Sequence, residues 1–562
     1  MGTSGLISRR GFLGLGALAA AGTAMAGLGG CAPRTQAAVA AEAASAAPDW
    51  LGAPREISPR DVVSTVTADV VVVGGGNGGM FAAAAAAEEG ASVALLEKAG
   101  EIGVNCREWI GAVGSRLQKD AGVEIDKHEI IETLCMYASH RCDQRLIRLW
   151  ADHSGETVDW LEDVVRSHDP NAYVFFETDI GEGDHGIYKT FAIQHNVQSD
   201  EERLRSLDFV AAEIEDLGVD VRTWTEMIQL AQDESGRVTG VYAEGPDGLM
   251  LFEATKGVIL ATGGYCGNRE MMESLNKLAV DHCVAMQSPG PSNLGDGIKA
   301  ALWAGAAKDE QPTVMVFDRG GVPAGTKGGC AYDGLGFMTH IGSQPFLKVN
   351  KDGERFCNES TPYDFIYAAG TLERDGVYCQ IWDANWLDHV AQFHTLACSR
   401  IIPSPTGGKA QIFTPEAEMG MIEGVLKPAG VVVEADTLEE LAEKLQIPAD
   451  AFVQTVKRYN ELCAKGDDED FGKESYRMIA LDTPPYQAAT IGGQLLCTLD
   501  GLRVNTDLQV LDADHDPIPG LYAVGNDSGG FFANNYPELL PGVACGRTIT
   551  FGRLAGKTVA HQ

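Results

Sequence analysis

The sequence is short of positive charge. It has 43 Lys and Arg against 79 Asp and Glu in 562 residues, a formal net charge of −36. This balance repels phosphate backbones and anionic lipid headgroups, which excludes nucleic acid as a partner. Hydrophobic residues still make up 45% of the chain, enough for large cores and, at this length, for two or three domains. We therefore expect a globular protein.

Motifs that bind metals and haem are also missing. The 13 cysteines form no CxxC pair, no CxxCH for covalent haem and no ferredoxin-like run. His340, His389 and His394 lack the spacing of metal ligands. No coiled-coil heptads, no repeat of solenoid length and no internal transmembrane segment is evident. Residue spacing therefore predicts no metal centre.

The first thirty residues have the pattern of an export signal. Arg9 and Arg10 precede an apolar run that is too short and too rich in Gly and Ala for a membrane span. The stretch SRRGFL resembles the twin-arginine signal, whose pathway exports folded proteins. We predict a signal peptide over residues 1–31, ending after AMA or, in a lipoprotein-like LGGC box, before Cys31 as a lipid anchor. The protein is then periplasmic or otherwise extracytoplasmic, and its thiols meet a reducing cytosol before export, so they need not pair.

A low-complexity stretch separates this signal from the folded body. Residues 32–66 are dominated by Ala, Pro and Ser without periodicity, which predicts a flexible linker. Structure begins with ADVVVVGGGNGGMFAAAAAAEEGASVALLEK, residues 68–98. This stretch has an apolar β-branched run, a glycine turn, an alanine-rich helical segment and a second strand that ends in an acid. It predicts a βαβ unit.

The glycine turn of this unit has the spacing of a dinucleotide-binding fingerprint. Gly74 permits the tight turn, Gly76 lets the backbone approach a pyrophosphate at the helix N-terminus, and Gly79 lets the helix lie close to the strand. The acid at the end of the second strand is placed to accept ribose hydroxyls. There is one such fingerprint, so a separate NADH domain is not predicted. The cofactor contacts expected here are Gly74, Gly76, Asn77, Gly78, Gly79, Glu97 and Lys98.

Further stretches along the chain point to one family. They are KGVILATGGYCGN at 256–268, SNLGDGIKAALWAGA at 292–306, FLKVNKDGERFCNES at 346–360 and PIPGLYAVGN at 517–526. With the βαβ unit, they resemble the fumarate reductase and succinate dehydrogenase flavoprotein family, which includes the ketosteroid dehydrogenases, from residue 68 onward. The resemblance implies bound FAD, with further contacts from Thr262, Gly263, Gly264, Asp296, Gly525, Asn526, Gly542 and Val543.

The resemblance also implies the architecture. We expect an α/β fold with a discontinuous Rossmann-like FAD-binding domain, formed by residues 67–310 and 490–562, and an inserted α+β capping domain over residues 311–489. The FAD is expected to be non-covalent, because EIGVNCREW after Glu97 lacks the histidine through which some family members attach it.

Several departures from the family fall on the substrate site. The RF-NE segment is kept as Arg355 to Glu359, but Pro362, Tyr363 and Asp364 follow where the family usually has an arginine. IWDANWLDH, residues 381–389, has no arginine at the place of the family's proton donor, and LLCTLDG stands where the family has HHTMGG. A dicarboxylate needs two cations to compensate for its desolvation, so we predict a neutral or singly charged substrate.

The closing stretch GNDSGGFFANNYPELLPG resembles the ending of the ketosteroid dehydrogenases. In those enzymes a tyrosine hydroxyl and a glycine N–H hold the ring ketone, which implies these roles for Tyr536 and Gly542. The turn is longer here by Glu538, Leu539 and Leu540. Tyr332 and Tyr363 are each a candidate for the acid or base at the substrate carbon, although a tyrosine at such a position is more often a core or rim aromatic. Glu359 is either part of a proton relay or an ion-pair partner.

These features predict an exported FAD-dependent reductase. Hydride passes from flavin N5 to the β-carbon of a C=C bond conjugated to a carbonyl, in a steroid-like or other α,β-unsaturated substrate, and a tyrosine protonates the α-carbon. The expected electron donor is a membrane-bound cytochrome or quinol. The alternatives are a 3-ketosteroid dehydrogenase running oxidatively, a fumarate-type reductase and a non-catalytic flavin carrier lipoprotein.

An iron–sulfur cluster is a further alternative. The chain also resembles exported flavin reductases of gut bacteria, of the cardiac-glycoside-reductase kind, which carry such centres. The cysteines near the family's motifs are Cys106, Cys266, Cys330 and Cys545. Buried structural thiols are the favoured interpretation of all four.

Overall fold

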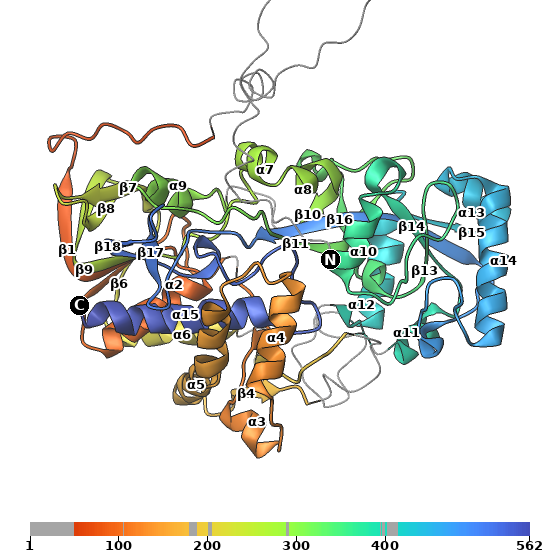
Figure 1. Cartoon of the computed structure of the whole chain (residues 1–562), viewed down its shortest axis with the longest axis horizontal. Helices are drawn as coiled ribbons and strands as arrows, with labels where there is room; N and C mark the ends of the chain where they lie inside the picture. Colours follow the sequence, from red (N-terminus) through yellow and green to blue (C-terminus); the bar gives the residue numbers. More distant parts are fainter. Residues whose placement is uncertain are drawn as a thin grey trace, which may run out of the picture. The chain divides into compact units, whose positions relative to one another are not determined.

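The computed structural model describes residues 50–104, 106–178, 188–199, 205–287, 292–393, 395, 399–401 and 414–562 (Figure 1). Residues Asp49–Gln562 form one compact unit. The predicted signal peptide with Arg9, Arg10 and Cys31 lies outside the described residues, as do Asn105 and His394.

The larger sheet has eight strands and contains the predicted βαβ unit. Its order is β17-β18-β9-β1-β2-β6, and β8 and β7 continue from β9 as antiparallel neighbours. Strand β1 pairs in parallel with both β2 and β9, so its valines are buried between two neighbours, which explains their unbroken apolar run. The strands are β1 (Ser64–Val73), β2 (Val93–Leu96), β6 (Asp220–Arg222), β7 (Glu226–Gln232), β8 (Val238–Gly245), β9 (Gly248–Leu260), β17 (Gln509–Leu511) and β18 (Pro517–Ala523).

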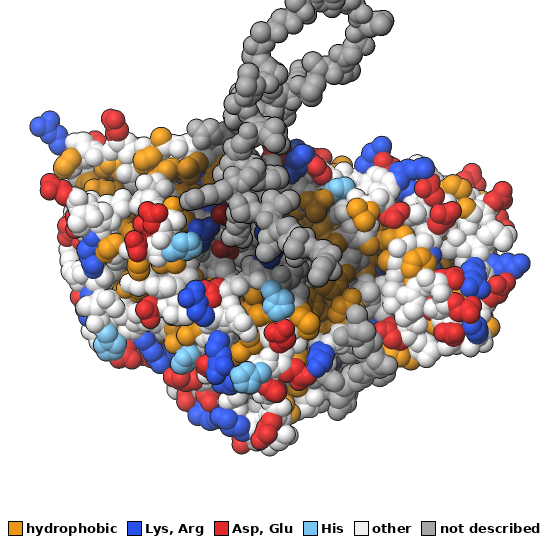
Figure 2. All heavy atoms as spheres, viewed as in Figure 1, with side chains coloured by type: hydrophobic (Ala, Val, Ile, Leu, Met, Phe, Trp, Pro, Cys, Tyr) orange, Lys and Arg blue, Asp and Glu red, His pale blue; other side chains and the backbone are white. Residues whose placement is uncertain are grey.

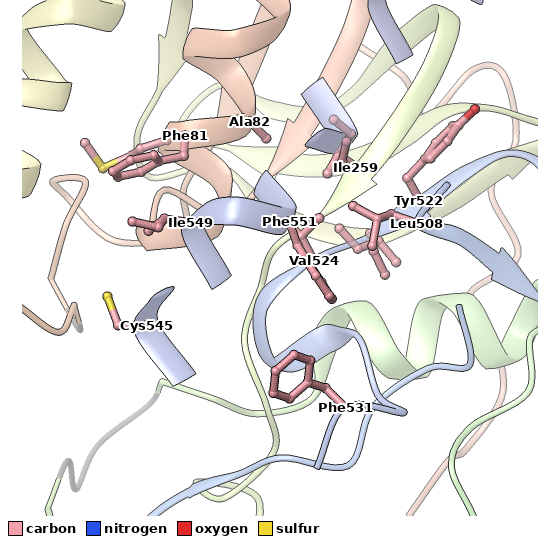
Figure 3. Close-up of a cluster of buried hydrophobic side chains, with 14 of the residues drawn as sticks. Phe81, Ala82, Ile259, Leu508, Tyr522, Val524, Phe531, Cys545, Ile549 and Phe551 are labelled. Atoms are coloured by element: carbon pink, nitrogen blue, oxygen red, sulfur yellow. The ribbon is translucent and has the colours of Figure 1, made fainter. Parts of the chain in front are cut away.

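Two helices from opposite ends of the described chain pack against each other on this sheet. They are α2 (Asn77–Glu88) and α15 (Val543–Ala560). A Cβ at Gly552 would collide with the Gly78 carbonyl oxygen, and one at Gly556 with that of Ala82, so the helices touch backbone to backbone. Figure 3 shows Phe81 of α2 near Ile549 of α15, in a buried cluster that also contains residues of β9 and the segment after β18.

A second sheet of seven strands forms a separate layer. Its order is β12-β11-β16-β14-β13, and β10 and β15 also pair with β16. The central strand β16 crosses the predicted boundary between residues 489 and 490, and β10 comes from the segment assigned to the FAD domain. The strands are β10 (Cys283–Met286), β11 (Val314–Val322), β12 (Phe337–Met338), β13 (Leu347–Val349), β14 (Tyr378–Trp382), β15 (Val432–Ala435) and β16 (Tyr486–Thr498).

A small three-stranded sheet and the remaining helices complete the fold. The sheet consists of β3 (Ile110–Gly111), β4 (Tyr173–Phe176) and β5 (Gln194–Gln198). The other α-helices are α3 (Arg116–Asp120), α4 (Lys127–Tyr137), α5 (Gln144–His168), α6 (Ser206–Asp216), α7 (Arg269–Leu275), α8 (Lys277–His282), α9 (Asp296–Trp303), α10 (Tyr363–Gly370), α11 (Trp386–Gln392), α12 (Pro415–Met421), α13 (Leu438–Leu445) and α14 (Ala449–Lys465). Shorter helical segments are η1 (Ala331–Asp333), η2 (His340–Ser343), η3 (Arg374–Gly376), η5 (Ile422–Leu426), η6 (Ser475–Arg477) and η7 (Gly525–Asp527).

The observed α/β architecture is the predicted one. The sequence of β1, α2 and β2 reproduces the βαβ unit, and β18 near the other end of the chain completes its parallel sheet. Figure 2 shows acidic and basic side chains interspersed over one face, with hydrophobic side chains gathered near its centre. Within the described part of the chain, none of the helices combines the length and the apolar character needed to span a membrane.

Candidate active site

A cavity of about 710 Å³ lies at the carboxyl ends of the parallel strands. Strands β1, β2, β9 and β18 run parallel, so the segments that follow them meet at one edge of the sheet, the usual place for a bound dinucleotide. The predicted cofactor residues that line the cavity are Gly74, Gly76, Asn77, Gly78, Glu97, Lys98, Thr262, Gly263, Gly525 and Asn526. Gly79, Gly264, Asp296, Gly542 and Val543 are not in its lining.

The glycines after β1 have distinct geometric roles. Gly74 has φ +105°, and a Cβ there would strike the Ala261 carbonyl, so the turn requires glycine. A Cβ at Gly79 would collide with the carbonyl oxygen of Gly74, which explains the close approach of α2 to the strand. Among the described residues, the only heavy atom within 4 Å of a Cβ at Gly76 is Cys106 Sγ, at 4.0 Å. Gly76 therefore borders open space, as a cradle for a pyrophosphate requires.

The acid after β2 is held by the backbone. Glu97 Oε2 accepts from the Gly75 N–H at 2.8 Å and Oε1 accepts from the Ala99 N–H at 2.8 Å. Each oxygen keeps a second lone pair for a ribose hydroxyl, and Glu97 lines the cavity. The neighbouring Lys98 is held by Asp296, with Nζ 2.7 Å from the carboxylate. Asp296 thus acts on the cavity through Lys98.

Arg107 brings positive charge to the same cavity. Among the described residues its guanidinium has no ion-pair partner, and it is part of the lining. Asn77 fixes its backbone, because Asn77 Nδ2 donates to the Arg107 carbonyl and Asn77 Oδ1 accepts from its N–H, both at 3.1 Å. A free cation beside a glycine cradle fits the diphosphate of FAD. Arg107 lies in EIGVNCREW, a stretch in which sequence reasoning looked only for a histidine.

The TGG turn after β9 is anchored by Asp527, a residue that sequence reasoning missed. Asp527 accepts from both the backbone N–H and the hydroxyl of Thr262. The same hydroxyl accepts from the Gly297 N–H at 3.0 Å, which ties the turn to the start of α9. Burial raises the pKa of Asp527 to about 7. The signal that could have found it is an acid directly after the Gly-Asn pair of the closing motif.

The Gly525-Asn526 turn after β18 is held by a buried arginine. Arg547 Nη1 donates to the carbonyl of Gly525 at 2.7 Å and to the hydroxyl of Ser528 at 2.8 Å. Its Nη2 contacts Asn526 Oδ1 at 3.3 Å, and the guanidinium lies near the rings of Phe531, Phe532 and Phe551. Burial lowers the pKa of Arg547 to about 10. The position of this cation fixes the turn that lines the cavity.

Helix α15 begins directly after Gly542, the glycine whose N–H the resemblance places at the substrate ketone. Gly542 is the N-cap, with φ +76°, and its carbonyl accepts from the Gly111 N–H at 2.8 Å. Within the described part of the chain, the Gly542 N–H donates no hydrogen bond. The next turn reaches the cavity through Ala544, Cys545 and Thr548. The positive end of this helix therefore faces the cofactor site.

The segment ANNYPELLPG, residues 533–542, is fixed on two sides. Asn535 Nδ2 donates to the Tyr137 carbonyl at 3.3 Å and Asn534 Nδ2 donates to the Ala138 carbonyl at 3.2 Å, at the end of α4. On the other side Glu538 accepts from the Tyr363 N–H at 2.7 Å, at the start of α10. Tyr536 between them is buried, and its ring packs on Phe532. The loop thus holds its phenol in one place.

The two other candidate tyrosines differ in position. The Tyr332 hydroxyl donates to the Cys266 carbonyl at 2.8 Å, and Tyr332 lines neither this cavity nor the smaller one described below. The Tyr363 ring packs edge-on against Phe317, with centroids 4.7 Å apart. Phe317 lies on β11 two residues after Met315, which lines the large cavity. Tyr363 is therefore the better placed of the two for a role at the substrate.

Glu359 is an ion-pair partner. Its carboxylate accepts from Arg355 Nε and Nη2, each at 2.8 Å, and Lys473 Nζ lies 3.5 Å away. Arg355 also donates to Asp468. Although burial acts in the opposite direction, Lys473 and Arg355 lower the pKa of Glu359. Of the two predicted roles, the geometry supports the ion pair and gives no support to the proton relay.

The four cysteines considered as iron–sulfur ligands do not converge. Cys266, Cys330 and Cys545 each contact a different backbone carbonyl, those of Leu496, Val284 and Arg107. In the described ranges, no group of three or more His, Cys, Asp or Glu side chains is arranged to hold a metal. Cys106 is partly buried, and burial raises the pKa of its thiol to about 12, which disfavours the reactive thiolate.

Comparisons with known proteins agree with this geometry. The family model for the FAD binding domain matches residues 69–538. A vinyl phenol reductase of Lactiplantibacillus plantarum is 31% identical over 477 residues, which cover 84% of this chain and 92% of that protein. A cytochrome-type fumarate reductase of Shewanella frigidimarina is 27% identical over 516 residues, covering 88% and 77%.

A solved structure shares the fold. The 3-ketosteroid-Δ4-(5α)-dehydrogenase from Rhodococcus jostii RHA1 superposes with a TM-score of 0.67 at 23% identity, covering 91% of this chain and 100% of that one. The suspected family is confirmed by the family model and the 31% identical relative, and so is the expectation of FAD. The chain belongs to the FAD binding domain family, and it is an FAD-dependent oxidoreductase acting on CH–CH and C=C bonds.

Proposed function

We propose that the protein is an exported reductase of C=C bonds conjugated to a carbonyl or to another electron-withdrawing group. The observation that carries this proposal is the fixed loop of residues 533–542. It holds the buried phenol of Tyr536 and ends at Gly542, the N-cap of the helix whose first turn lines the cofactor cavity. A phenol and a backbone N–H on one short loop suit the oxygen of a conjugated carbonyl.

In the proposed reaction FAD, when bound and reduced, supplies a hydride to the β-carbon of the double bond. Tyr536 and the Gly542 N–H donate to the carbonyl oxygen, where negative charge develops as the hydride arrives. A second acid, for which Tyr363 is the candidate, gives a proton to the α-carbon. The fixed loop restricts the phenol before substrate binds, so little conformational entropy is lost in the complex.

The charges near this loop support a substrate with fewer than two carboxylates. Arg400 lies 3.5 Å from Glu177, Arg477 donates to the Phe393 carbonyl at 2.9 Å, and Arg319 donates to Gln494 Oε1 at 3.2 Å. These buried arginines are thus engaged by protein groups. A dicarboxylate would have to compete for them at a cost in broken interactions. The relative that is 31% identical is named a vinyl phenol reductase, so we propose aryl alkenes as candidate substrates besides the enones expected from the sequence.

We expect the reduced enzyme to be reoxidised by a neutral or singly charged conjugated alkene and not by fumarate. The test is anaerobic: dithionite-reduced protein is mixed with steroid enones, cinnamates, 4-vinylphenol and dicarboxylates, and the return of flavin absorbance is followed. Rapid reoxidation by fumarate alone would revive the dicarboxylate reductase. Failure of every alkene, with reoxidation by a redox dye, would favour the flavin carrier.

Export is proposed from the sequence and concerns residues outside the described ranges. Replacing both Arg9 and Arg10 by Lys should retain the protein in the cytoplasm, because the twin-arginine pathway distinguishes guanidinium from ammonium groups. Cell fractionation and immunoblotting measure the outcome. Full export of the Lys-Lys variant would instead assign the signal to the general secretory route. A membrane-bound cytochrome or quinol is the proposed electron donor for the exported enzyme.

A further inference from the structure

A second, much smaller cavity lies beside Tyr363, the candidate proton donor. Its volume is about 40 Å³, enough for a water molecule. Glu538, Tyr363 and Ser399 line it, together with Glu359, Asp318 and Arg477. Asp318 follows Phe317 on β11, so this strand runs from Met315 at the large cavity to the small one. A proton in the small cavity is therefore close to the proposed substrate site.

Glu538 is the carboxyl group that joins this cavity to the substrate loop. It is buried, its Oε1 accepts from the Ser399 hydroxyl at 2.6 Å, and its Oε2 accepts from the Tyr363 N–H at 2.7 Å. Burial raises the pKa of Glu538 to about 7, although both hydrogen bonds favour the carboxylate. In contrast to Glu359, it has no bidentate arginine among the described residues.

Asp364 supplies a second buried carboxyl next to it. Asp364 follows Tyr363 on α10, and neither of its carboxyl oxygens has a hydrogen-bond partner among the described residues. Burial, and then the negative charge of Glu538, raise the pKa of Asp364 well above its usual range. Asp364 is thus a second carboxyl group in this region whose surroundings favour the neutral form.

The other charged and titratable groups around Glu538 come from three elements and from the loop before α10. Asp318 of β11 opposes its ionisation and Arg477 of η6 favours it. Tyr137 of α4 is buried, and the charges of Asp364 and Glu538 add to the burial that raises its pKa. Glu359 faces the same cavity but is neutralised by Arg355 and Lys473. Glu538 thus lies in surroundings of low polarity, and the charge of Arg477 offsets only part of the burial that disfavours its ionisation.

We propose that Glu538 supplies the reaction's proton to Tyr363 through the small cavity that both residues line. The inference rests on the proposed function and deepens it, because it names the proton source for the α-carbon. It places at Glu538 the relay that was one of the two roles predicted for Glu359.

The step balances without a further reactant. The α-carbon gains a proton as the Tyr363 O–H bond breaks, and the resulting phenolate takes the proton of the Glu538 carboxyl group. The Glu538 carboxylate is then reprotonated from solvent. The two electrons come with the hydride from reduced FAD, so each turnover consumes one hydride and one proton.

Glu538→Gln tests the proposal because glutamine keeps the size and shape of the glutamate side chain but has no acidic proton. Its amide oxygen can accept from the Tyr363 N–H while its NH₂ donates to Ser399. In the wild type, turnover should decline as the pH rises through about 7, since Glu538 loses its proton there. In Glu538→Gln, turnover should fall about 10²-fold and this limb of the pH profile should vanish. Glu310→Gln, at an exposed carboxylate, is the matched control.

Ser399→Ala gives a second, directional test. The lost hydrogen bond had favoured the carboxylate, so the pKa of Glu538 should rise and the alkaline limb should move to higher pH. An unchanged limb in both variants would overturn the proposal. Glu538→Gln with full turnover would overturn it as well, and so would a slow variant whose limb stays at the wild-type pH.

Infrared difference spectroscopy separates this inference from the proposed function. The difference between the spectra of the wild type and Glu538→Gln, both without substrate, should show the carbonyl stretch of a protonated carboxyl that disappears near pH 7. Asp527, whose pKa burial also raises to about 7, contributes to both spectra and cancels. Absence of the band from this difference overturns the inference. If the band titrates but no alkene is reduced, the proposed function fails while the proton remains assigned to Glu538.

Discussion

Gly76→Val should give a folded protein that contains no FAD. Gly76 is the N-cap of α2, with φ −89° and ψ −168°, a conformation that valine adopts readily. Among the described residues, the one heavy atom within 4 Å of a Cβ at this position is Cys106 Sγ, at 4.0 Å. The fold without cofactor therefore has room for the new side chain. The branched methyl groups then occupy the cradle that the pyrophosphate requires. The ratio of flavin to protein absorbance after purification measures the loss.

The control for this variant is Gly420→Val. A Cβ at Gly420 also meets nothing within 4 Å, but the residue lies in α12 and is not in the lining of the cofactor cavity. It should keep its flavin. Circular dichroism should find the secondary structure unchanged in both variants. Stoichiometric FAD in Gly76→Val would contradict the assignment of the fingerprint.

Tyr536→Phe should keep FAD and fold but lose about 10²-fold in turnover, the scale of removing one donor to a developing oxyanion. The ring is buried against Phe532, and phenylalanine preserves that packing. Only the hydroxyl is lost, so the effect should fall on kcat more than on KM. Steady-state kinetics on an alkene identified by flavin reoxidation gives both constants.

Tyr173→Phe, at an exposed position of β4, is the matched control and should behave as the wild type. Wild-type turnover in Tyr536→Phe would reduce the loop to a packing element. The oxygen of the substrate would then have to be held elsewhere, and Tyr363→Phe would be the next variant to measure.

The elements that could be predicted are those whose sequence signals lie close together along the chain. Val70 to Val73, the glycine turn and the alanine-rich helix follow one another within twenty residues, so strand, turn and helix can be recognised without knowing their neighbours. The pairing of β10 with β16 joins residues more than 200 positions apart. No pattern within either strand identifies its partner, and the predicted domain boundary consequently fell inside β16.

The same distinction applies to the site. Glycines that line the cavity are identifiable by their spacing, whereas Asp527 and Arg547 act on segments distant from them in sequence or on backbone carbonyls. Glu359 and Glu538 show the limit most clearly. The bidentate arginine of Glu359 lies only four residues before it, but its second cation, Lys473, comes from a distant segment. The partners of Glu538, Ser399 and the Tyr363 N–H, are both more than 100 residues away, so only the tertiary fold reveals them. Charge state is set by neighbours in space.

The backbone contact between α2 and α15 has a consequence for how the protein is made. Gly552 and Gly556 of α15 pack against α2, a helix that the ribosome synthesises more than 450 residues earlier. Until α15 has emerged from the ribosome, the cavity lacks Ala544, Cys545 and Thr548. A nascent chain without this helix therefore offers flavin no complete site, and cofactor loading must follow the synthesis of α15.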